Sequence, residues 1–397
     1  MTIELPFRLY RQTVLITVFL MSLVFLIAEI INDRFWLPDF EVYYKAAERL
    51  LSGITLYRHP EDLHYIYKYS PVCAVFFVPF SLIPFYAAKI IFWFFLTGVI
   101  AYGFIACAEL STYSQIRSEK SVSIAILIAI FCLALHFLRE LHLGQVNQLL
   151  FAGYLIMARS YLLNKEKTVS VFFALTFFIK PFALIFIPLF IFRKQYRLIL
   201  KIIISIVVLS FTPLLFNTSI EHFISEYFNW FHELRVEMSH KQGLFTAGNL
   251  TIFSIAARYT PLGFLITNGI NIPAFQLLTL TIIAGCYYWF IKNEKPPVHG
   301  TIADFGLLIA TIPLLAYTSE NAFGFAELTV VLILMNWQRI TLPFRILAIT
   351  GLVLLGGNFA EVIGRKLSVI ADNLSLVSIG TIFLIAVLFR LRYKQIV

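Results

Sequence analysis

The chain has 397 residues, of which 60% are hydrophobic and 13% charged, and its mean hydropathy is +0.84. Soluble domains carry about 25% charged residues, so this composition excludes an ordinary soluble protein and predicts a polytopic membrane protein. The net charge of +9 comes from Lys and Arg in short segments between apolar runs. That pattern is typical of cytoplasmic loops, and no nucleic-acid-binding motif accompanies it.

The cysteines also exclude two classes of protein. Cys73, Cys107, Cys132 and Cys286 each lie within or beside an apolar run, and none forms a CxxC pair. This spacing supports neither a disulfide framework nor a zinc site. The sequence contains no P-loop, GxSxG or HExxH motif, so the common soluble-enzyme chemistries are not indicated.

Apolar runs long enough to cross a membrane recur along the chain. We expect spans near 13–31, 85–108, 121–138, 148–163, 199–216, 272–291, 301–317, 324–338, 342–358 and 374–390. A further run, 169–192, is broken at Lys180-Pro181 and predicts a hairpin that enters the membrane and returns. The predicted fold class is an all-α polytopic membrane protein of about 10–12 transmembrane helices, built as a single domain over residues 1–397.

The basic short loops fall on one side of this predicted bundle, which places both termini in the cytoplasm. The first span, 13–31, is too long for a signal-peptide core and lacks a small-residue cleavage site, so we expect it to be uncleaved. The two longest loops, 32–84 and 217–271, then lie on the outer side. They carry amphipathic, aromatic segments that predict helices lying in the membrane interface.

The first outer loop contains "LPDFEVYYKAAERLLSG", which predicts an amphipathic helix over 40–52 that ends at Gly53. Asp39 stands directly before it. One interpretation is that Asp39 caps the helix N-terminus. The other is that its carboxylate is a general base, held at the membrane surface where it meets a hydroxyl substrate.

The next stretch, "YIYKYSPVCAVFFVPFSLIP" at 65–84, is interrupted by three prolines. It predicts either a helix that dips partway into the membrane and returns or a kinked span. A polar cluster follows later, in "HFLRELHLGQVNQLL". There Arg139 and His142 are candidates to bind a phosphate, and the alternative is a solvated turn around Gly144.

Lys180 lies in the middle of an apolar run. A charged residue inside a membrane costs at least about 2.5 kcal/mol and needs a partner. Beside the helix break at Pro181, this lysine predicts a site for an anionic lipid headgroup, although it could also snorkel to the interface. The predicted topology gathers Asp39, Arg139, His142 and Lys180 on the outer side, which favours the general-base interpretation of Asp39.

Two later outer segments, "AGNLTIFSIAARY" and "AYTSENAF", could reach the same cavity or be ordinary loops. The predicted site therefore contains Asp39 as base, with Arg139, His142 and Lys180 binding a phosphate. The expected substrate-binding residues are Glu41, Tyr43, Gln145, Asn147, Asn249, Arg258, Glu320 and Asn321.

Taken in order, five segments resemble glycosyltransferase family 87: "PDFEVYYKAAERLLSGITLY", "YKYSPVCAVFFVPFSLIP", "LGQVNQLL", "FFIKPFALIFIPLFIF" and "GNLTIFSIAARY". The resemblance implies a GT-C-type membrane bundle. It also implies a sugar donor linked to a polyprenyl monophosphate. The transferred sugar is expected to be a hexose or a pentose, and mannose is the first expectation. The catalytic acid of the family's first outer loop corresponds to Asp39. The late loop "YTSENAF" lacks the Trp and His that many members carry there, which leaves the acceptor open.

The resemblance implies inverting transfer to a lipid or glycan acceptor at the outer face of a bacterial plasma membrane. We expect no required metal, since a carboxylate base and cations suffice. An Asp39-x-Glu41 site for Mg²⁺ or Mn²⁺ is the alternative. Expected partners are the donor, the acceptor and membrane lipids, but not nucleic acid. Two other functions stay open: a lipid-linked-sugar transporter or flippase, and a non-catalytic protein of envelope assembly.

Overall fold

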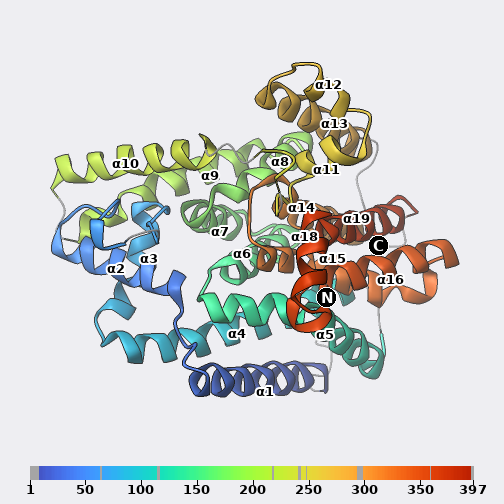
Figure 1. The fold of residues 1–397 in the computed structure, drawn as a ribbon, viewed down its shortest axis with the longest axis horizontal. Coiled ribbons are helices and arrows are strands. Elements are labelled where there is room, and N and C mark those ends of the chain that lie inside the picture. Colours follow the sequence, from blue (N-terminus) through green and yellow to red (C-terminus); the bar gives the residue numbers. More distant parts are fainter. Residues whose placement is uncertain are drawn as a thin grey trace.

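The computed structural model describes residues 9–62, 65–113, 117–216, 219–239, 243–246, 248–292, 298–357 and 359–394, and all regular secondary structure in these segments is helical (Figure 1). The α-helices are α1 (Leu9–Ile31), α2 (Pro38–Ser52), α3 (Pro71–Ser81), α4 (Phe85–Thr112), α5 (Glu119–Leu143), α6 (Asn147–Leu162), α7 (Glu166–Ile179), α8 (Ile187–Phe192), α9 (Tyr196–Ser210), α10 (Ile220–Ser239), α11 (Ile252–Tyr259), α12 (Gly263–Thr267), α13 (Ile272–Lys292), α14 (Val298–Leu315), α15 (Glu327–Met335), α16 (Leu342–Gly356), α17 (Ala360–Ile363), α18 (Arg365–Asn373) and α19 (Leu376–Tyr393). Short 3₁₀-helices are η1 (Pro60–Asp62), η2 (Pro181–Phe186), η3 (Thr212–Leu215), η4 (Glu320–Ala326) and η5 (Trp337–Arg339).

Within the described segments, five helices are long and apolar enough to cross a membrane, which confirms the all-α polytopic prediction. They are α1, α4, α5, α19 and the segment Tyr196–Leu215 that joins α9 to η3. Five further apolar helices are shorter: Pro71–Ser81, Pro181–Phe192, Ile272–Tyr288, Gly300–Leu315 and Leu342–Gly356. The total of 10–12 spans stays a prediction.

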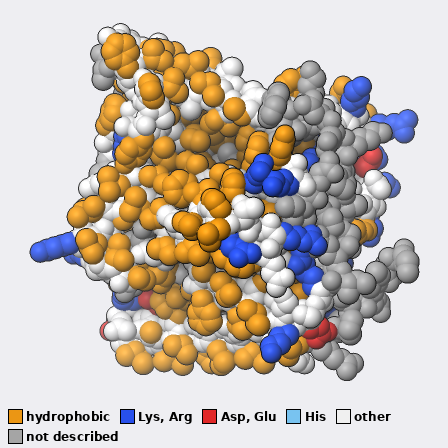
Figure 2. Space-filling model, turned by 90° about the vertical axis from the view of Figure 1, so that its right-hand side faces the viewer, with side chains coloured by type: hydrophobic (Ala, Val, Ile, Leu, Met, Phe, Trp, Pro, Cys, Tyr) orange, Lys and Arg blue, Asp and Glu red, His pale blue; other side chains and the backbone are white. Residues whose placement is uncertain are grey.

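The surface of the bundle has the character of a membrane protein. Large apolar side chains point outward on α1 and α9, among them Val24 at 67% and Val208 at 61% exposure. Figure 2 shows one face on which hydrophobic side chains cover a broad area and Lys and Arg gather beside it. Such a surface is stable where lipid covers the apolar area and water the basic part.

Small and polar residues hold neighbouring membrane helices together. Between α1 and α4, Trp93 donates to Ser22 (2.8 Å), whose hydroxyl is 2.6 Å from that of Thr97. Between α16 and α19, a Cβ added to Gly351 would meet the carbonyl oxygen of Gly380 at 3.0 Å. Close backbone approach and interhelical hydrogen bonds replace the hydrophobic effect, which is weak between helices in lipid.

The basic residues Arg193 and Arg392, predicted on the same side of the membrane, meet in space. Asp304 on α14 accepts from Arg193 at the end of α8 (2.6 Å) and from Arg392 on α19 (3.2 Å). The Asp304 side chain is only 1% exposed. This bridge fixes the ends of three distant helices on one face of the bundle.

The segment 65–84 does not form a kinked span. Its helix, α3, has 11 residues, about 16 Å at 1.5 Å per residue, whereas a hydrocarbon core is about 30 Å thick. Ser70 caps its start by accepting from the Cys73 amide (3.1 Å), and the chain turns before Phe85. α3 lies beside α2 at one end of the molecule, and α10 contacts α3 (Figure 1).

Candidate active site at the start of helix α2

Asp39 is the second residue of α2 and not its N-cap, so the capping interpretation is wrong. The N-cap is Leu37, which makes no side-chain cap and has left-handed dihedrals (φ 49°, ψ 59°). Pro38 occupies the first helical position, where a missing N–H costs nothing, and this moves the helix start ahead of Asp39. The carboxylate is therefore not occupied in a cap. Gly53 ends the helix in a left-handed conformation (φ 66°), as predicted.

The turn between α5 and α6 packs directly on this helix start. Gly144 has φ +67°, and a Cβ there would lie 2.8 Å from Phe40 Cβ and 3.1 Å from Leu37 Cβ. Only glycine allows this approach without displacing α2. The contact brings Gln145 close to Asp39, where its side chain lowers the pKa of the Asp39 carboxyl.

Lys180 joins the same cluster from α7. The chain is extended at this residue (φ −143°, ψ 132°), so the helix breaks where Lys180-Pro181 predicted. Its Nζ donates to Asn147 Oδ1 (2.7 Å) and lies 3.5 Å from Gln145 Oε1. Its charge also interacts with the Asp39 and Glu140 carboxylates. Lys180 thus has the partners that a charge in an apolar run requires.

Glu140 is the centre of the network, a role that the sequence prediction missed. It is fully buried and accepts from the Gln148 amide (3.0 Å), Asn147 Nδ2 (3.1 Å) and the Asn321 side chain. Sequence did hold a signal, because a carboxylate at the end of an apolar span is the kind of partner that a buried lysine needs. The network links α5, α6, α7 and η4.

The Asp39 carboxylate is partly buried beside two tyrosines. Burial raises the pKa of Asp39 above its ordinary value, and this is opposed by the charge of Lys180, the side chain of Gln145 and the charge of Lys68. Tyr43 and Tyr69 lie close to Asp39, and their hydroxyls are 2.8 Å apart. Lys68 and Tyr69 were not predicted as site residues.

Arg139 and His142 do not join Lys180 in a single cation cluster. Arg139 lies 3.5 Å from Glu320. His142 pairs with Glu29 of α1, and its ring centroid is 6.3 Å from that of Trp36. Each of the three predicted phosphate ligands therefore has its own carboxylate neighbours.

The remaining predicted residues have different surroundings. Asn321 belongs to the network through Glu140. Glu41 forms a surface pair with Lys45 (2.7 Å). Asn249 is buried and accepts from Thr251 (2.7 Å), and Arg258 donates to the Thr246 carbonyl (2.6 Å). The last two contacts lie within the segment 246–258 and are not shared with Asp39.

A polar cavity of about 360 Å³ opens beside this network. Arg139, Tyr317, Thr318, Glu320, Ser368 and Asp372 are among the residues that line it. Because Arg139 and Glu320 are the chain neighbours of Glu140 and Asn321, the cavity wall and the buried network share two backbone segments.

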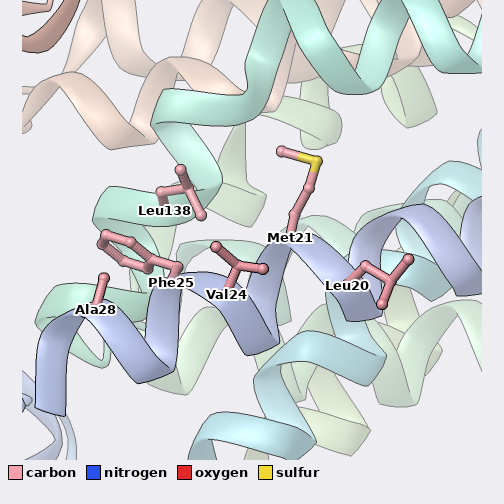
Figure 3. A pocket seen from close by; sticks show the side chains of 6 residues that line it. All are labelled: Leu20, Met21, Val24, Phe25, Ala28 and Leu138. Carbon is pink, nitrogen blue, oxygen red and sulfur yellow. The ribbon is translucent and has the colours of Figure 1, made fainter. Parts of the chain in front are cut away.

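A separate apolar groove of about 410 Å³ lies between α1 and α5. Figure 3 shows side chains of α1, from Leu20 to Ala28, facing Leu138 of α5. His142 follows Leu138 by one helical turn, and its partner Glu29 follows Ala28. The groove therefore runs toward a polar pair near the C-terminal ends of both helices.

Within the described segments, no group of three His, Cys, Asp or Glu side chains has a geometry that could hold a metal ion. Of the expected Asp39-x-Glu41 pair, Glu41 is engaged with Lys45. Whether activity requires Mg²⁺ or Mn²⁺ stays a prediction.

The sequence was also compared with known proteins. A family model described as glycosyltransferase family 87 matches residues 67–335, a segment that includes Glu140, Asn147, Lys180 and Asn321 but begins after Asp39. No curated protein matches the chain significantly.

Proposed function

The chain belongs to glycosyltransferase family 87, and from this premise we propose that Asp39 is the general base of sugar transfer from a polyprenyl-phosphate donor. The family makes the protein a membrane glycosyltransferase. The observation that carries the proposal is the surroundings of Asp39. Asp39 does not cap the helix, and burial raises the pKa of its carboxyl. The charge of Lys180 and the side chain of Gln145 lie beside it. A carboxylate of raised pKa in such surroundings suits proton abstraction.

The reaction proceeds with inversion. Asp39 takes the proton of an acceptor hydroxyl while that oxygen forms a bond to the anomeric carbon. The bond from the anomeric carbon to the phosphate oxygen breaks, and its electron pair leaves with the lipid phosphate. Lys180, held by Asn147 at 2.7 Å, stabilises the developing negative charge, as fixed cations do at sites of transferring groups.

The α1–α5 groove supports a lipid-linked donor. Its lining, from Leu20 to Ala28 with Leu138, is almost entirely apolar and suits an isoprenoid chain. His142 stands one turn beyond Leu138 toward the outer end, where a phosphate would follow such a chain. Mannose is the sugar to test first, on the strength of the family resemblance.

The test is Asp39→Asn, assayed in membranes with radiolabelled polyprenyl-phosphate mannose. Transfer falls about 10²–10⁴-fold, the usual contribution of a general base. Glu48→Gln is the matched control, because it neutralises an exposed acid on the same helix that belongs to no part of the proposed site, and it keeps near wild-type transfer. Unchanged turnover in Asp39→Asn would remove the base assignment.

A lipid-linked-sugar flippase is the competing function, because it would also need the groove and Lys180. It predicts that Asp39→Asn leaves movement of the lipid across the membrane intact and that the wild type transfers no sugar. Measuring transfer and lipid translocation on the same reconstituted vesicles separates the two.

A further inference from the structure

The polar cavity beside Arg139 has the dimensions and lining of a small-ligand site. Its volume, about 360 Å³, lies within the range of about 300–1,000 Å³ for such sites. Four separate segments form its wall: the end of α5, the loop at 248–250, the loop at 317–320, and the region of α17 and α18. Because four segments far apart in the sequence form this cavity, its shape and polar groups can select one ligand more closely than a groove between two helices can.

The charges of the described lining residues disfavour a phosphate. Among these residues Arg139 is the single guanidinium, whereas Glu320 and Asp372 supply two carboxylates. An anion entering the cavity would meet net negative charge, so the ligand is neutral or cationic. This separates Arg139 from the donor phosphate to which its sequence position assigned it.

The hydrogen-bonding groups favour a polyhydroxylated ligand. Carboxylates accept, guanidinium donates, and the hydroxyls of Ser368 and Thr318 can do either, so each hydroxyl of a sugar could find a partner. The Thr318 hydroxyl is buried and has no hydrogen-bond partner among the described residues. Tyr317, which is 56% exposed, adds an aromatic ring at the cavity wall, a surface on which the C–H face of a sugar can pack.

The cavity is connected to the proposed catalytic group through a continuous set of contacts. Arg139 and Glu320 are followed in the chain by Glu140 and Asn321, which hydrogen-bond to each other. Glu140 also binds Asn147, which binds Lys180 beside Asp39. A ligand in the cavity therefore sits against the same two segments that hold the buried network.

We infer that this cavity binds a neutral sugar residue of the acceptor, set back from the hydroxyl that Asp39 deprotonates. The inference rests on the proposed function and assigns its acceptor class: a glycan or glycolipid headgroup with at least one uncharged sugar beyond the reacting one. This assigns acceptor binding to four lining residues: Arg139, Thr318, Ser368 and Asp372.

The test fills the cavity. Ser368→Trp places an indole in its wall, and Val369→Trp, at an exposed neighbour on α18 that does not line it, is the matched control. The full-length protein in nanodiscs is titrated with α-linked mannobiose and, separately, with inorganic phosphate, and binding is followed by ligand-observed NMR. Mannobiose binding falls at least tenfold in Ser368→Trp and stays within twofold of wild type in Val369→Trp.

Transfer kinetics add a second measurement with the same variants and mannobiose as acceptor. Ser368→Trp raises the KM for mannobiose at least tenfold and leaves the KM for the lipid donor within twofold. A raised donor KM with an unchanged mannobiose KM overturns the inference, as does phosphate binding that is lost in Ser368→Trp, or a wild type that binds no mannobiose. If mannobiose binds at the cavity and no sugar is transferred, the proposed function fails and the cavity assignment stands.

Discussion

At the scale of the residue, the proposed chemistry rests on the carboxylate of Asp39, whose neighbours shift its pKa in opposite directions. Burial raises the pKa of Asp39, whereas Lys180, Gln145 and Lys68 hold it down. The sequence predicted both Asp39 and Lys180 because each is a charged side chain in or beside an apolar segment. It did not identify Glu140, which accepts three hydrogen bonds in the core of the network.

This balance sets the pH dependence of transfer. A general base acts only when deprotonated, so activity rises with pH through the raised pKa of Asp39. Lys180→Met removes a charge that lowers this pKa, so the acid limb of the kcat/KM profile moves to higher pH, and the residual rate falls. Lys180→Arg keeps the charge and serves as the control. A limb that stays in place in Lys180→Met would show that Lys180 does not tune the base.

At the scale of the element, the site depends on how closely a turn approaches a helix. Pro38 and the left-handed Leu37 fix where α2 begins, and Gly144 lets the α5–α6 turn rest on Leu37 and Phe40. Sequence predicted the helix, its end at Gly53 and a turn at Gly144. The capping interpretation of Asp39 fails because Pro38 takes the first helical position, which makes Leu37 the N-cap and Asp39 the second residue of the helix.

Gly144→Ala tests this contact. Alanine at φ +67° costs about 1–2 kcal/mol, and its Cβ would also push against Phe40 Cβ at 2.8 Å, which displaces α2 and with it Asp39. Thermal unfolding in detergent and transfer rates measure the two effects. Gly269→Ala is the control, since Gly269 has φ +92° and nothing within 4 Å of the added Cβ. Equal losses in both variants would mean that only the backbone conformation matters.

At the scale of the whole molecule, the arrangement of helices separates a basic side from the side that carries Asp39. Asp304 joins Arg193 and Arg392 from helices far apart in the sequence. Asp39, Lys180, Glu140 and Asn321 come together from four elements elsewhere. The positive-inside rule then predicts that the Asp39 side faces outward.

Cysteine labelling in cells checks this orientation. In a variant whose four native cysteines are replaced by Ala, Glu48→Cys on α2 reacts with a membrane-impermeant maleimide added outside. Lys394→Cys, next to the end of α19, reacts only after permeabilisation. Both positions are exposed in the structure. Labelling of Lys394→Cys alone in intact cells would reverse the predicted topology.

The sequence by itself determined the class of protein, the break at Lys180 and the two charged residues on which the proposed chemistry depends. These features are local, because hydropathy, a proline and a charged residue in an apolar run can each be recognised within a few residues of sequence. Only the tertiary structure decided that Lys180 faces Asn147 and Asp39, that Arg139 pairs with Glu320 and lines one cavity with Asp372, and that His142 pairs with Glu29. Arg139, His142 and Lys180 look equivalent in sequence. Packing separates them, because the fold places different carboxylates beside each of the three side chains.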